Sequence, residues 1–193
     1  GSSDIICSRY EINGNTLEDL HGAITDRQNG AGSWEKKEEK RYAAYAIANY
    51  TVDYSPYLIG LTSCNGEVAV ELGASAKVHR EIHLHLPHFN TSNDDIRDNC
   101  RAEEARLLSH EMEHVKAYRL CSETMQDSIA SARAIGHGSN FWSAMMMARL
   151  ELDRIVDNRM DQSIELANNI NLAIDKLTSH GMNIGNCGIT QYI

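Results

Sequence analysis

The stretch Leu107-Leu-Ser-His-Glu-Met-Glu-His114 is the most informative part of this chain. Its pattern is H-E-x-x-H, and residues four apart on an α-helix lie one above the other on the same face. His110 and His114 can therefore offer ring nitrogens to one metal ion, while Glu111 projects one step around the helix. The pattern is typical of zinc-binding helices, and it predicts a carboxylate that takes a proton from a metal-activated water.

The flanking residues argue against a chance match on a solvated helix. Composition alone would produce the pattern in about three of a hundred such chains. Leu107 lies three residues before His110, so the histidine face continues an apolar stripe that points towards a core. The segment 101–134 contains neither Gly nor Pro, so a helix can run through the motif without a break.

Length, composition and charge limit the class of protein. A chain of 193 residues, of which 42% are hydrophobic, can form a core. We expect a single domain over residues 4–193, sheet-rich over 4–90 and helical over 91–180. The net charge of −9, without a basic stripe, argues against a nucleic-acid partner. No apolar run approaches the ~18 residues of a membrane span.

The first residues and the cysteines bear on localisation. Gly1-Ser-Ser3 resembles a cloning remnant, so a signal peptide would already have been removed. The five cysteines include no C-x-x-C pair, which argues against a thiolate zinc site. One or two disulfides with a free thiol, or five buried thiols, are both compatible with this odd number.

The first half of the chain has the patterns of β-strands. We expect strands over 4–13, 41–54 and 58–72, the second closed by Pro56 and the third interrupted near Asn65-Gly66. With a further strand before residue 90, they predict a small, mostly antiparallel sheet of about four strands.

The further strand is Glu81-Ile-His-Leu-His-Leu-Pro87, which alternates clearly and should end at its proline. Its isoleucine and leucines would face the core, while His83 and His85 would face outward. This histidine pair could be the polar side of the strand, line a substrate groove or bind metal. An extended peptide could add to the edge of this strand as a substrate.

Helical patterns dominate the second half, after a short helix capped by Thr16. Ser92 or Asn93 can cap a helix that carries the H-E-x-x-H motif and continues towards Ala134. The segment 141–179 repeats apolar residues three or four apart, which predicts one very long helix or two with a break near 157–158. The predicted fold class is α+β, with a small sheet packed on the motif helix and long C-terminal helices after it.

A catalytic zinc needs a third protein ligand and one position left open for water. The candidates after the motif are Glu123, His137, Glu151, Asp153, Asp157 and His180. Glu123 would lie roughly 13 Å along the same helix, which is too far, and the other acids are more simply exposed charges. His137 and His180 lie at predicted helix junctions, where a side chain can be directed inward, and the residues alone leave this choice open.

Segments along nearly the whole chain carry a resemblance to a known family. They include Tyr10-Glu-Ile-Asn-Gly14, Cys64, Ile82 to Pro87, Leu108 to His114, Asp175 and Thr178-Ser-His-Gly181. On these residues the chain resembles a bacterial family of unknown function catalogued as predicted secreted zinc-dependent proteases. The resemblance implies a zincin-like fold, a secreted or periplasmic location and, from the family's terminal D-x-x-T-x-H-G signature, His180 as third ligand. The family usually has Tyr where this chain has Ile174.

A second, local resemblance implies a different third ligand. Leu107 to His114, followed by Gly136-His-Gly-Ser-Asn-Phe141, resembles SprT-type metallopeptidases. In that family the later H-G-x-x-F supplies the third histidine, which would be His137.

These observations predict a zinc-dependent peptidase acting on a protein or peptide. His110 and His114 would bind Zn²⁺ with His180, or alternatively His137, and Glu111 would be the general base. The alternative is a non-catalytic binding module in which zinc is structural and the long helix from residue 141 recognises a protein partner. The sequence gives no indication of the oligomeric state.

Overall fold

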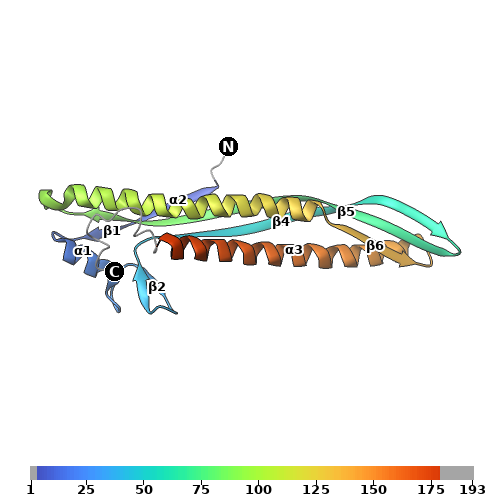
Figure 1. Cartoon of the computed structure of the whole chain (residues 1–193), viewed down its shortest axis with the longest axis horizontal. Helices are drawn as coiled ribbons and strands as arrows, with labels where there is room; N and C mark the ends of the chain where they lie inside the picture. The colour runs from blue at the N-terminus through green and yellow to red at the C-terminus, as the bar shows by residue number, and fades with distance from the viewer. Residues whose placement is uncertain (1–3, 179–193) are drawn as a thin grey trace. The chain divides into compact units, whose positions relative to one another are not determined.

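The computed structural model describes residues 4–178, and all structural statements below concern that part of the chain (Figure 1). The elements follow in the order β1-α1-β2-β3-β4-β5-α2-β6-α3. Two compact units are formed. Within the described residues, the first unit comprises 4–49, 81–118 and 170–178, and the second comprises Tyr50–Arg80 and Arg119–Asn169.

The main sheet has four strands, and its central strand is β5 (Glu67–Asn90). In the first unit β1 (Ile5–Asn13) pairs with β5 in parallel, with Ile5 opposite Ile82. On its other side β5 pairs with β4 (Tyr45–Cys64). The sheet therefore contains a parallel pair that the sequence did not predict.

Asn65-Gly66 connects β4 to β5 as a two-residue hairpin, so these two strands run antiparallel. Both residues have positive φ, 50° and 80°, which is the conformation that an Asn-Gly turn favours between twisted strands. The sequence-based expectation of an interruption at this point is confirmed.

Neither proline ends a strand, contrary to expectation. β4 continues through Pro56, which an edge strand tolerates because it has a neighbour on only one side. β5 continues through Pro87, which keeps its register opposite Tyr10 of β1. The result is two long strands in place of the shorter ones that were predicted.

The first unit also contains α1 (Leu17–Thr25) and a small antiparallel sheet of β2 (Ser33–Glu35) and β3 (Lys40–Tyr42). The Thr16 hydroxyl caps α1 by accepting a hydrogen bond from the Asp19 N–H at 3.0 Å, as predicted. Around α1 a core forms from Ile12, Leu20, Ile24, Ala43, Leu86, Phe89, Cys100 and Leu107.

The helix α2 (Asp94–Ala130) carries the H-E-x-x-H motif. The Asn93 side chain caps it, accepting from the Asp95 N–H at 3.0 Å. Ile82 and Leu84 of β5 are buried with Val115 of α2, which confirms the predicted core-facing side of this strand. The motif helix therefore packs on this face of the sheet within the first unit.

The second unit contains β6 (Arg133–Gly138), which the sequence did not predict, and most of α3 (Phe141–Thr178). β6 pairs antiparallel with the first part of β5. Its backbone also lies close to α3, as Gly136 shows: a Cβ atom added there would stand 2.1 Å from the Ala148 nitrogen. α3 is one continuous helix, capped by the Asn140 side chain. The core of this unit is Val70, Leu72, Ala74, Met125, Ile129, Ala132, Ala134, Ala144, Ala148, Leu152 and Val156.

The fold is thus a mixture of α and β with a small sheet and long helices, as expected. None of the helices in residues 4–178 is both long and apolar enough to span a membrane. Over the same residues the thiols of Cys7 and Cys64 are free and exposed, and those of Cys100 and Cys121 are free and buried. Cys187 lies outside the described residues.

Candidate metal centre

The motif residues of α2 are buried. His110 is 3% exposed, Glu111 4% and His114 5%. The two imidazole rings meet edge to face, with centroids 4.9 Å apart and Nε2 atoms 3.3 Å apart. The histidines are one helical turn apart, and the Nε2 atoms of both rings point to one position.

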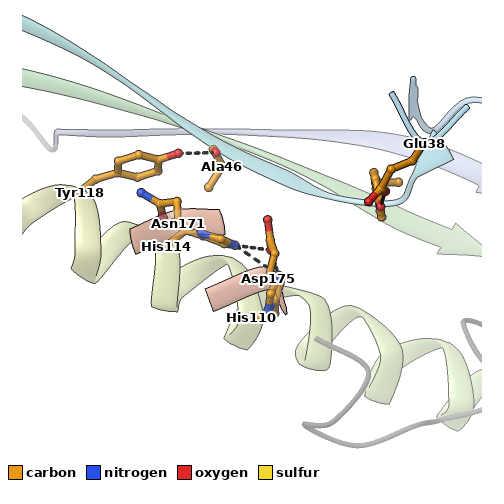
Figure 2. A network of polar contacts seen from close by, with 8 residues as sticks. Glu38, Ala46, His110, His114, Tyr118, Asn171 and Asp175 are labelled. Atoms are coloured by element: carbon orange, nitrogen blue, oxygen red, sulfur yellow. Dashed lines mark hydrogen bonds and ion pairs between the residues drawn. The ribbon is translucent and has the colours of Figure 1, made fainter. Parts of the chain in front are cut away.

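A carboxylate from α3 reaches the same point. Asp175 Oδ1 lies 3.1 Å from His110 Nε2 and 2.8 Å from His114 Nε2 (Figure 2). Neighbouring ligand atoms of a tetrahedral zinc site are roughly 3.3 Å apart, since each lies about 2.1 Å from the ion. The three separations are close to that value, and two imidazoles with one carboxylate form a known catalytic zinc set. The residues present therefore fit a zinc ion.

The position of Asp175 follows from the register of α3. Asn171 and Asp175 are four residues apart and lie on one face of the helix, which continues from the buried Ala167. Asn171 is 8% exposed, and its Oδ1 lies 2.7 Å from His114 Nδ1. Asn171 and Asp175 thus place polar groups on the face of α3 that is apolar at Ala167 and before it.

The electrostatic surroundings differ among the buried groups. Burial raises the pKa of Glu111 to about 6, against the opposing influence of His110 and His114, and the charge of Asp175 adds to the rise. Burial alone would lower the pKa of His114. Hydrogen bonds to Asp175 and Asn171, with the nearby carboxylate charges, outweigh burial and raise that pKa. The centre therefore concentrates carboxylates where a cation would be stabilised.

The edge strand β4 lies beside this centre. Tyr118, one turn beyond His114, donates a hydrogen bond from its hydroxyl to the Ala46 carbonyl of β4 at 3.1 Å (Figure 2). Ala46 and Ala48 also pack against the cluster that contains Val115. Among the strands of residues 4–178, β4 has a sheet neighbour on one side only. The Ala46 carbonyl of this edge strand is therefore within hydrogen-bond reach of the motif helix.

His83 and His85 do not join the centre. They alternate with Ile82 and Leu84, so they lie on the sheet face opposite the motif helix. His83 Nε2 is 2.6 Å from Glu81 Oε1. The described part of β5 around these histidines lies between β1 and β4, so the expectation that a peptide could add to the edge of this strand is wrong.

His85 has a packing role in the sheet. Its ring stacks between Tyr10, at 4.7 Å, and Tyr45, at 4.9 Å, and its Nδ1 is 2.9 Å from the Ser8 hydroxyl. Burial lowers the pKa of His85. These contacts account for the residue as part of a ring stack across three strands, and its proposed contact with substrate stays a prediction.

Of the two histidines considered as third ligand, the structure describes only His137, which does not join the centre. His137 is on β6 of the second unit and not at a helix start; its side chain is 60% exposed, and its Nδ1 lies 3.2 Å from Glu67 Oε1. His180 lies outside the described residues. Within 4–178, the group of side chains that could hold a metal is His110, Glu111 and His114, to which the distances above add Asp175.

The acidic candidates also have other surroundings. Glu151 forms an ion pair with Arg154, and Asp153 accepts hydrogen bonds from Tyr54 and Arg149. Both lie in the second unit, as do Glu123 and Asp157, which are exposed.

Asp175 was not among the candidates chosen from the sequence. It was noticed only as the first residue of the D-x-x-T-x-H-G signature, whose histidine drew attention as the ligand. A signal was present, because Asn171 and Asp175 stand where the apolar repeat of α3 should place core residues.

Comparisons with protein-family models, curated proteins and solved structures gave no match for this chain. The family resemblances noted in the sequence remain expectations.

Proposed function

We propose that this chain is a zinc-dependent peptidase whose metal ligands are His110, His114 and Asp175. The observation that carries the proposal is the convergence of two imidazole nitrogens and one carboxylate oxygen within 2.8–3.3 Å of one another. A second carboxylate, that of Glu111, is buried next to them and remains available as a base. This arrangement supports a zincin-like mechanism in which α2 supplies the two histidine ligands and the base, and α3 supplies the third ligand.

Each group has a separate task in peptide hydrolysis. Zinc, when bound, would polarise the scissile carbonyl and make a water molecule acidic enough to attack it. Glu111 accepts the proton of that water and passes it to the leaving amine. The buried setting of Glu111 keeps its carboxylate away from bulk solvent, so the proton is exchanged with the substrate.

The substrate would bind as an extended peptide along β4. Unpaired backbone groups of an edge strand can hydrogen-bond an added strand. Tyr118 ties β4 to α2 at Ala46, which keeps that edge next to the metal centre. This position replaces the edge that was predicted around residues 81–86.

A matched pair of glutamates on α2 tests the mechanism. We expect Glu111→Gln to retain zinc and to lose casein or peptide hydrolysis by roughly 10²–10⁴-fold, because the base is removed and the ligands are kept. Glu113→Gln is the control, since Glu113 is exposed and pairs with Lys116 at 2.9 Å.

Hydrolysis that survives in Glu111→Gln would contradict the proposed base. Wild-type protein that retains one zinc ion per chain and cleaves neither casein nor a peptide mixture would indicate a structural zinc site in a binding module instead.

A further inference from the structure

The imidazole of His114 has a different polar neighbour at each ring nitrogen. Nε2 faces His110 Nε2 at 3.3 Å and Asp175 Oδ1 at 2.8 Å. Nδ1 lies 2.7 Å from Asn171 Oδ1 (Figure 2). A neutral imidazole carries one proton, and a carbonyl oxygen can only accept a hydrogen bond. Asp175 Oδ1 is an acceptor as well, so the two contacts alone do not decide the tautomer. A metal ion bound at Nε2 would use the lone pair of that nitrogen, and the single proton would then be on Nδ1, where the Asn171 oxygen accepts it.

We propose that Asn171 is a positioning residue for His114, which it holds in the Nδ1–H form with Nε2 directed at the metal centre. The inference rests on the proposed zinc site and deepens it. Residues that accept a hydrogen bond from a metal-binding histidine fix its tautomer and ring orientation. No role was assigned to Asn171 from the sequence.

Burial makes this contact important. Asn171 is 8% exposed and His114 5% exposed, so bulk water has little access to the Nδ1–H group. A buried donor that loses its acceptor is costly, and the ring would turn to find another partner. Rotation about the His114 side chain would move Nε2 away from Asp175, so losing the amide should weaken metal binding.

The neutral amide also suits the charge of the centre. Glu111 and Asp175 already place two carboxylates next to the histidines. An amide oxygen accepts the Nδ1–H bond without adding a third negative charge. Because Asn171 and Asp175 lie one helical turn apart on α3, one helix face delivers the orienting group and the metal ligand together.

Asparagines on the same helix provide a matched test. Zn²⁺ affinity is measured by competition with a chromophoric chelator for Asn171→Leu, Asn171→Ala, Asn171→Asp and Asn169→Leu, where Asn169 is exposed. We expect the Leu and Ala variants at position 171 to bind Zn²⁺ about 10–100-fold more weakly. Asn171→Asp keeps an acceptor and should stay within about threefold of wild type, and Asn169→Leu should be unchanged.

A spectroscopic readout separates positioning from general loss of structure. Long-range ¹H–¹⁵N NMR spectra show which ring nitrogen of His114 carries the proton. Nδ1–H is expected in zinc-loaded wild type and in Asn171→Asp, and a mixture of protonated forms is expected in metal-free Asn171→Ala.

Unchanged Zn²⁺ affinity in both Asn171→Leu and Asn171→Ala, or an equal loss in Asn171→Asp, would overturn the assignment to Asn171. Folded wild-type protein that binds no Zn²⁺ would overturn the metal site itself, so the two failures are distinguishable.

Discussion

The buried faces of the same two helices are more polar in the first unit than in the second. In the first unit the buried face of α2 carries Glu103, Arg106, His110, Glu111 and His114. In the second unit the buried face of the same helix carries mainly apolar side chains, among them Met125 and Ile129. α3 shows the same contrast, with Ala148 and Leu152 buried in the second unit and Asn171 in the first.

This contrast shows where folding and function place different demands on one helix. Burying polar groups without partners is unfavourable, whereas burying apolar side chains stabilises the fold. Concentrated, paired, buried polar groups are a common sign of a functional site. We therefore propose that the first unit carries the chemistry and that the second unit contributes stability.

The largest expected loss of stability comes from breaking the buried ion pair of the first unit. Arg106 donates from Nε to Glu103 Oε1 at 3.1 Å, and both side chains are buried. Arg106→Met leaves the carboxylate of Glu103 without this partner and should lower the free energy of unfolding by about 3–5 kcal/mol in urea titrations. The double variant Glu103→Met/Arg106→Met should recover part of that loss. A double variant whose loss of unfolding free energy equals the sum of the losses in Glu103→Met and Arg106→Met would contradict the pairing.

In the second unit, truncation of the apolar core should affect stability alone. Leu152 is fully buried on α3, and Leu152→Ala should cost about 2–5 kcal/mol of unfolding free energy. Zn²⁺ affinity of the folded variant should stay at the wild-type value. The exposed Leu150→Ala is the control on the same helix. A large drop in Zn²⁺ affinity for Leu152→Ala would break the division of roles between the units.

Metal binding should stabilise the first unit in particular. Zinc at 100 times its dissociation constant adds about 2.7 kcal/mol to the stability of the state that binds it. Hydrogen exchange should slow at the α2 amides around residues 107–117 when zinc is added, and much less at 122–130. Equal protection of both segments would argue against a site confined to the first unit.

The smallest effect is expected at the alternative histidine of the second unit. His137 is largely exposed and its contact with Glu67 is at the surface, where ion pairs contribute about 0–1 kcal/mol. His137→Ala should leave Zn²⁺ affinity and peptide hydrolysis unchanged. A tenfold weaker Zn²⁺ affinity would restore His137 as a ligand.

The parts of the centre that depend on the local geometry of one helix were predicted correctly from the sequence. H-E-x-x-H places two histidines and a glutamate on one helix, and their mutual positions depend only on the helical repeat. The caps at Thr16 and Asn93 were likewise predicted correctly, because a cap depends on neighbouring residues.

Long-range pairing was predicted less well. The parallel pairing of β1 with β5 joins residues far apart in sequence, and no local pattern reports it. β6 is a short strand with two glycines, a composition that is typical of a turn. It forms a strand because its backbone pairs with β5. The polar positions Asn171 and Asp175 of α3 are visible in the sequence, but the approach of Asp175 to His110 depends on how α3 packs on α2, which no local pattern reports.

The most direct test of the account is the zinc content of purified wild type and of Asp175→Ala after equilibrium dialysis against buffered Zn²⁺. We expect one zinc ion per wild-type chain and an affinity more than about 100-fold weaker in Asp175→Ala, beyond the effect of losing an orienting neighbour. Wild-type protein without zinc, or Asp175→Ala with wild-type affinity, would contradict a centre made of His110, His114 and Asp175.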